Sequence, residues 1–82
     1  MKYKLFSRVS LSANLTKHRL RRGDVATIVE RHPGRPGEEP GYSLEVCNAV
    51  GETIAVVTVP ESKIEALKAE SLLHVRPLAS AA

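Results

Sequence analysis

The clearest pattern of hydrophobic and polar positions lies between residues 42 and 59. Apolar and polar positions alternate in residues 42–47, which is the period of a strand with one buried face. Residues 53–59 are almost continuously apolar and β-branched, which predicts a central strand covered on both sides. Between them, residues 48–52 include Asn48 and Gly51, which tolerate the positive φ of a tight turn. The pattern therefore predicts a β-hairpin.

Shorter alternating segments predict three more strands. In the first of them Val9 and Leu11 are expected to face the interior, because they alternate with arginine and serine. In the last, Leu73 and Val75 are expected to face inward, with histidine and arginine facing the solvent. The three segments are residues 5–13, 24–31 and 72–77.

Polar, proline and glycine residues separate the predicted strands. Residues 14–23 are polar and basic, and their apolar anchors Leu15 and Leu20 predict a loop that folds back over the sheet. Residues 32–41 contain three prolines and three glycines, which excludes helix and ladder pairing and predicts an exposed loop. Residues 60–67 begin with proline and have capping-box spacing, so we expect one or two helical turns there.

The predicted order is strand, long loop, strand, loop, strand, tight turn, strand, helical turn, strand. In a chain of 82 residues, closure into a small barrel is the economical way to remove exposed strand edges. This order is that of an SH3-like barrel. We therefore expect an all-β protein: a small five-stranded SH3-like barrel with one short helical turn before the last strand. It forms a single domain over residues 1–78, followed by a flexible tail at residues 79–82.

Composition narrows the class of protein. Hydrophobic residues make up 43% of the chain and aromatic residues 4%, so we expect an ordered domain with an aliphatic core. The single cysteine, Cys47, excludes an internal disulfide and fits a reducing compartment, which predicts a cytoplasmic location. No apolar run approaches the ~20 residues of a membrane helix, so we expect no membrane association. A net charge of +3 is compatible with an anionic partner.

Five stretches of the chain carry a resemblance to known proteins. They are residues 20–29 (LRRGDVATIV), 41–46 (GYSLEV), 48–53 (NAVGET), 56–60 (VVTVP) and 73–78 (LHVRPL). Together they resemble a bacterial family of small uncharacterised proteins with an SH3-like fold. The resemblance implies that fold. Because members of the family look like companions of other small proteins, it also implies an accessory or antitoxin-like role.

The sharpest local feature of the sequence is a run of basic residues. Lys17, His18, Arg19, Arg21 and Arg22 lie within six consecutive positions of the first loop. Such a run can neutralise several phosphates, or it can contact an acidic protein face. It contains no aromatic residue on which a base could stack, and a solvated loop before a strand is the simpler interpretation. These five residues are our candidate contacts for a partner protein or a nucleic acid.

Other reactive residues give weaker signals. His18, His32 and His74 fall on different predicted elements without the spacing of metal ligands, so we expect no metal and no cofactor. Cys47 at a strand end is expected to be a small hydrophobic residue rather than a nucleophile. Residues 33–36 have P-x-x-P spacing, which more often marks a stiff loop than a ligand for an aromatic groove.

These observations favour a non-catalytic protein-interaction module whose partner is another protein. Its contact surface is expected to be an exposed sheet edge or one of the loops, residues 14–22 and 32–41. A sheet edge could also pair two copies of the chain as a homodimer. The less favoured alternative is a nucleic-acid-binding module that uses the basic loop at residues 17–22. No residue of the sequence supports an enzyme.

Overall fold

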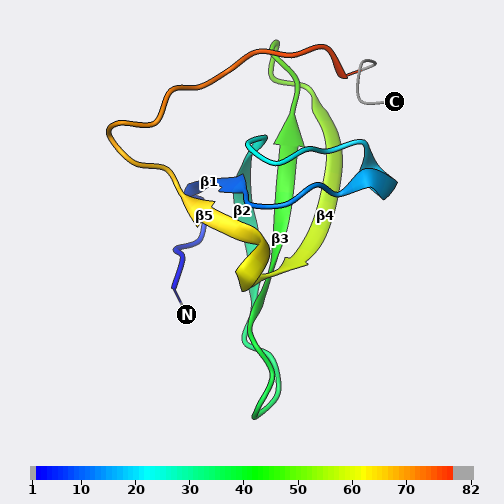
Figure 1. The fold of residues 1–82 in the computed structure, drawn as a ribbon. Coiled ribbons are helices and arrows are strands. Elements are labelled where there is room, and N and C mark those ends of the chain that lie inside the picture. The colour runs from blue at the N-terminus through cyan, green and yellow to red at the C-terminus, as the bar shows by residue number, and fades with distance from the viewer. Residues whose placement is uncertain (1, 79–82) are drawn as a thin grey trace.

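The computed structural model describes residues 2–78, which form strands and short 3-10 helices (Figure 1). The expected tail at residues 79–82 lies outside the described residues. The elements are β1 (Arg8–Leu11), η1 (Thr16–His18), β2 (Val25–His32), β3 (Gly41–Cys47), β4 (Thr53–Pro60), η2 (Glu61–Lys63) and β5 (Ile64–Ala66).

The five strands form one antiparallel sheet in the order β4-β3-β2-β1-β5. Since β4 and β5 lie at opposite ends of this order and do not pair within residues 2–78, the sheet is open. A register shift between Ile28 and Glu30 bends β2, as β-bulges do. In Figure 1, β1 and β5 cross the direction of β3 and β4. The all-β prediction is confirmed, whereas the described sheet is not a closed barrel.

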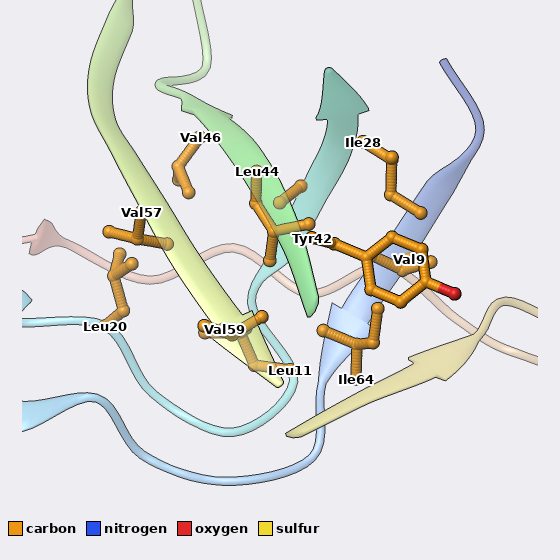
Figure 2. Packing of buried hydrophobic residues seen from close by; sticks show 11 residues of the cluster. Val9, Leu11, Leu20, Ile28, Tyr42, Leu44, Val46, Val57, Val59 and Ile64 are labelled. Atoms are coloured by element: carbon orange, nitrogen blue, oxygen red, sulfur yellow. The ribbon is translucent and has the colours of Figure 1, made fainter. Parts of the chain in front are cut away.

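One face of the sheet carries the core, as the alternating pattern predicted. Tyr42 and Leu44 of β3 are fully buried, and Val9 and Leu11 of β1 face them (Figure 2). Burying one such side chain contributes roughly 1.5–3 kcal/mol, so an aliphatic cluster can hold a domain of this size. The buried cluster comprises Val9, Leu11, Leu20, Ala26, Ile28, Tyr42, Leu44, Val46, Val57, Val59 and Ile64.

The prediction that residues 53–59 form a central strand covered on both sides is wrong. The strand exists, but β4 lies at the edge of the sheet. Val57 and Val59 are each 4% exposed on the core side, whereas Val56, on the other side, is 61% exposed. Ile54, 40% exposed, lies at a register shift in the pairing with β3. Continuous β-branched composition favours a strand wherever it lies, so it does not distinguish a central strand from an edge strand.

The predicted last strand at residues 72–77 is also wrong. The fifth strand is β5, and it pairs with β1 by placing Ile64 opposite Leu11. The helical turn is limited to η2, since the Ser12 N–H donates to the Lys63 carbonyl at 2.8 Å and the ladder with β1 begins there. The first apolar residue after η2, Ile64, thereby fills the core position that was expected for a later residue. Residues 67–78 form a C-terminal arm without strand pairing, in which Val75 is 86% exposed.

The N-terminal segment is fastened to β3 and η2 through Tyr42. The Tyr3 N–H donates to the Tyr42 hydroxyl at 3.2 Å, and the two rings pack edge to face at 5.5 Å. The Tyr42 hydroxyl in turn donates to Glu61, the first residue of η2. The Tyr3 hydroxyl reaches the Ile64 carbonyl at 3.3 Å. These bonds fix the point at which the chain leaves β4 and enters β5.

Residues 33–40 form an exposed loop between β2 and β3, as expected from their prolines and glycines. The expected bounds of 32–41 are wrong at both ends, because His32 and Gly41 pair with each other as the ends of β2 and β3. Gly34 has φ 77°, and a Cβ there would lie 2.8 Å from the Glu39 carbonyl oxygen, so only glycine fits. Glu39 also accepts hydrogen bonds from the Ser62 N–H at 2.8 Å and from its hydroxyl at 3.2 Å. The loop base is therefore tied to η2.

Candidate functional site

The basic run lies on a hairpin, residues 14–23, which we call the basic hairpin. Leu15 and Leu20 exchange backbone hydrogen bonds at 2.9 and 3.2 Å, and η1 forms the tip between them. Leu20 is 2% exposed and joins the core cluster. The two leucines therefore hold the hairpin over the sheet, as their apolar character predicted.

The structure brings the five predicted contact residues together on this hairpin. Lys17, His18, Arg19 and Arg22 are exposed, and Arg21 is half-buried. Arg19 adopts a left-handed conformation with φ 58°, and its N–H closes the turn on the Thr16 carbonyl. Because Leu20 points into the core, the charged side chains that flank it are presented to the solvent. No residue between positions 14 and 23 is acidic.

An ion pair from the C-terminal arm supports the base of the hairpin. Arg76 donates to both carboxylate oxygens of Asp24, from Nε at 3.0 Å and from Nη2 at 2.5 Å. The same guanidinium donates to the Arg19 carbonyl at 3.2 Å, and the Arg21 N–H donates to Asp24 at 2.7 Å. Asp24 is therefore already engaged at the base of the hairpin. Sequence reasoning missed Arg76, since its only signal was an outward position in a strand that does not form.

These contacts shift the pKa values of Asp24 and Arg76. Partial burial raises the pKa of Asp24, but the hydrogen bonds from Arg76 and from the Arg21 N–H, with the attraction of both guanidinium groups, lower it more. The net pKa of Asp24 lies below its ordinary value of 3.8. The hydrogen bond to Asp24 correspondingly raises the pKa of Arg76. The ion pair is therefore formed at neutral pH.

The second component of the site is the side of β4 that faces away from β3, which we call the free edge of β4. Within residues 2–78 no strand pairs with it. Its eight residues include no charged side chain, and Val56 is exposed on the face opposite the core. The other edge strand, β5, has three residues and carries Glu65. One edge of the sheet is thus short and charged, and the other is long and uncharged.

The basic hairpin and the free edge of β4 are neighbours. In Figure 1 the hairpin crosses β4, and η1 projects past it. Figure 2 places Leu20 of the hairpin beside Val57 of β4, and both belong to the core cluster. The hairpin covers the core side of β4, whereas Val56 is exposed on the opposite side, so the hairpin and the exposed side of β4 adjoin along the free edge.

A groove of about 590 Å³ lies between the C-terminal arm and the end of the sheet. Its lining includes Val25, Cys47 and Ile54 from the sheet, with Leu73 and His74 from the arm. Cys47 is exposed there rather than packed as a small hydrophobic residue. Cys47 and His74 both line this groove, and among the described residues no hydrogen bond joins them.

The histidines serve different parts of the fold. His32 Nε2 lies 2.8 Å from the Ser43 hydroxyl, which itself contacts Thr58 at 3.0 Å, while His18 and His74 are exposed elsewhere. Across residues 2–78 no group of three acidic, histidine or cysteine side chains is placed to hold a metal ion. In the same part of the chain, no helix has the length and apolar character needed to cross a membrane.

Fold and surface together define a small all-β domain with an uncharged edge strand beside a basic hairpin. A family model matches residues 5–66, which include all five strands, and the chain belongs to that family, the domain of unknown function DUF4926. The resemblance to an uncharacterised family is confirmed, although the match ends before residues 73–78, which carried part of it. Neither a curated protein nor a solved structure matches the chain.

Proposed function

We propose that this chain is a non-catalytic protein-interaction module that binds another protein along the free edge of β4. The observation that carries the proposal is the uncharged edge itself, with Ile54 and Val56 exposed beside it. Soluble proteins normally protect edge strands with charges, prolines, bulges or short length, because unpaired N–H and C=O groups attract other strands. β4 has a register shift at Ile54 and ends at Pro60, but residues 55–59 between them carry no charge, proline or bulge and are suited to accept a strand from a partner.

We also propose that the domain is SH3-like. The strand order β4-β3-β2-β1-β5, the long hairpin between β1 and β2, and the 3-10 turn before β5 support this interpretation. A groove for proline-rich peptides, however, requires a row of exposed aromatic side chains. Tyr42 is fully buried and Tyr3 half-buried, which leaves Phe6, 71% exposed, by itself. The proposed partner therefore contacts the strand edge rather than an aromatic groove.

The proposal is tested with Val56→Lys, which places a charge beside the free edge without removing a core contact. Val50→Lys is the matched control, because Val50 is 80% exposed in the turn between β3 and β4. Each variant is used as bait in a lysate of the native cell, and retained proteins are quantified by mass spectrometry. We expect proteins held by the wild type and by Val50→Lys to be lost with Val56→Lys. Equal retention by all three would contradict the proposal.

A second candidate function, nucleic-acid binding, is favoured by one observation. Lys17, Arg19 and Arg22 are exposed on a hairpin that contains no acidic residue. If these residues contact phosphates, the logarithm of the affinity for single-stranded RNA falls with the logarithm of the salt concentration, with a slope of roughly −0.7 per phosphate. Fluorescence anisotropy with a labelled RNA measures this slope, and undetectable binding at low salt excludes the candidate. An accessory or antitoxin-like role, homodimer formation and a cytoplasmic location stay predictions.

A further inference from the structure

We infer that the segment docking on β4 is an extended, acidic stretch of another protein. Its backbone pairs with the free edge of β4, and its carboxylates contact the basic hairpin. This inference rests on the proposed function and specifies the chemistry of the partner. Two features of the surface support it: the alternation of side chains along β4 and the positive charge of the hairpin. A third argument is that a second copy of the chain has the wrong charge for this surface.

The alternation of side chains along β4 determines which side chains a paired partner strand needs on each face of the sheet. Ala55, Val57 and Val59 face the core side, whereas Val56 faces the opposite side. An added strand continues this alternation, because directly opposed residues of an antiparallel pair lie on the same face of the sheet. β-Branched or other apolar residues at alternate positions of the partner would cover Val56.

The hairpin sets the charge of the partner. Lys17, Arg19 and Arg22 are exposed on the hairpin, whose tip η1 projects past β4 in Figure 1, and residues 14–23 supply no carboxylate to neutralise them. The neighbouring Asp24 is bonded to Arg76 and to the Arg21 N–H, so it is not available to the exposed cations. A strand entering along β4 therefore passes a cluster of positive charge, which favours an acidic segment over a neutral or basic one.

A second copy of the chain fits this surface less well. Its own β4 has no carboxylate from Thr53 to Pro60, so the pairing strand itself carries no charge opposite to that of the hairpin. It also brings another basic hairpin, and the chain has a net charge of +3. Nucleic acid would match the cations but would leave Val56 uncovered.

The test is selection from a library of random peptides of about ten residues, enough to span β4 at ~3.3 Å per residue. The full chain is the target, together with Val56→Lys and with a hairpin variant that carries Lys17→Gln, Arg19→Gln and Arg22→Gln. A charge-matched control carries Arg35→Gln, Lys63→Gln and Lys68→Gln, all at exposed positions outside the hairpin. Thermal melting confirms that each variant is folded.

We expect the wild type and the charge-matched control to select peptides rich in β-branched residues and in Asp or Glu. The hairpin variant is expected to keep the β-branched preference and to lose the excess of carboxylates. In the wild type, the best peptide should bind about tenfold more weakly at ~0.5 M salt than at low salt. Val56→Lys should select none of these peptides.

Each other outcome overturns part of the account. If the selected peptides have no excess of carboxylates, the inference is overturned. The same holds if the excess is also found with the hairpin variant. In both cases the proposal that a partner binds the free edge of β4 is unaffected. The absence of any peptide that depends on Val56 overturns both the inference and the proposed function. A dimer that sedimentation shows to be lost in Val56→Lys would make a second copy the occupant. RNA that displaces the selected peptide would assign the hairpin cations to nucleic acid.

Discussion

Arg76 forms a bidentate ion pair with Asp24, a residue 52 positions earlier in the chain. The same guanidinium donates to the Arg19 carbonyl, so one side chain of the C-terminal arm joins the start of β2 to the basic hairpin. The family match ends at residue 66, and the arm therefore lies outside it. A contact from outside the matched domain thus braces a hairpin inside it.

Replacing Arg76 should release the arm. In Arg76→Gln the bidentate pair is lost, and we expect the free energy of unfolding to fall by about 1 kcal/mol, since the pair is largely but not fully shielded from solvent. Heteronuclear NMR relaxation should show increased motion in residues 70–77. Arg35→Gln, at an exposed loop position, serves as the control. Unchanged relaxation of the arm in Arg76→Gln would show that Arg76 does not hold it.

The same pair predicts the pH dependence of the arm. The pKa of Asp24 is lower in the folded protein than its ordinary value of 3.8, so the pair's contribution is fully present above that value. It is lost as the pH falls through the lower, folded pKa, when the carboxylate takes up a proton. NMR titration of the Asp24 carboxyl carbon measures this pKa, and the Asp24→Asn variant should lose the transition in the arm. A midpoint at or above 3.8 would contradict the assignment.

Tyr42→Phe should destabilise the junction between β3, η2 and the N-terminal segment. The variant keeps the buried ring but removes the bond to Glu61 and the acceptor for the Tyr3 N–H. We expect a loss of about 1–2 kcal/mol in urea denaturation. Burial and the hydrogen bond to Glu61 raise the pKa of Tyr42 above its ordinary value of 10.0. Ultraviolet titration should therefore show Tyr42 ionising above that pH, and ionisation at or below it would contradict this environment.

Two glycines of the β2–β3 loop offer a matched pair of substitutions. Gly34 and Gly37 both have positive φ, so Gly→Ala costs about 1 kcal/mol at either from backbone strain alone. At Gly34 the new Cβ would also meet the Glu39 carbonyl oxygen at 2.8 Å, whereas nothing lies within 4 Å at Gly37. Thermal denaturation should therefore show a larger loss for Gly34→Ala than for Gly37→Ala. Equal losses would mean that the loop adjusts to the added methyl group.

The sequence predicted the features that depend on neighbouring residues. The hairpin over residues 42–59 is confirmed, because strand period and turn chemistry are both local. The exposed cations of residues 17–22 were likewise expected, since Leu15 and Leu20 were the hairpin's apolar anchors.

The features that depend on distant pairing were missed. Whether Ile64 or a later residue fills the last core position depends on which segment reaches β1, and alternation alone does not decide this. The place of β4 at the edge depends on the order of the whole sheet. Arg76 could not be predicted as a site residue, because its partner Asp24 is 52 positions away in the sequence.

The central claim is that a partner pairs with the free edge of β4. Hydrogen–deuterium exchange of the β4 amides, measured with and without the partner captured from the lysate, tests it most directly. The account predicts that amides between Thr53 and Pro60 exchange at least about tenfold more slowly in the complex, while those of β5 are unchanged. Slower exchange confined to other segments, with β4 unaffected, would contradict it.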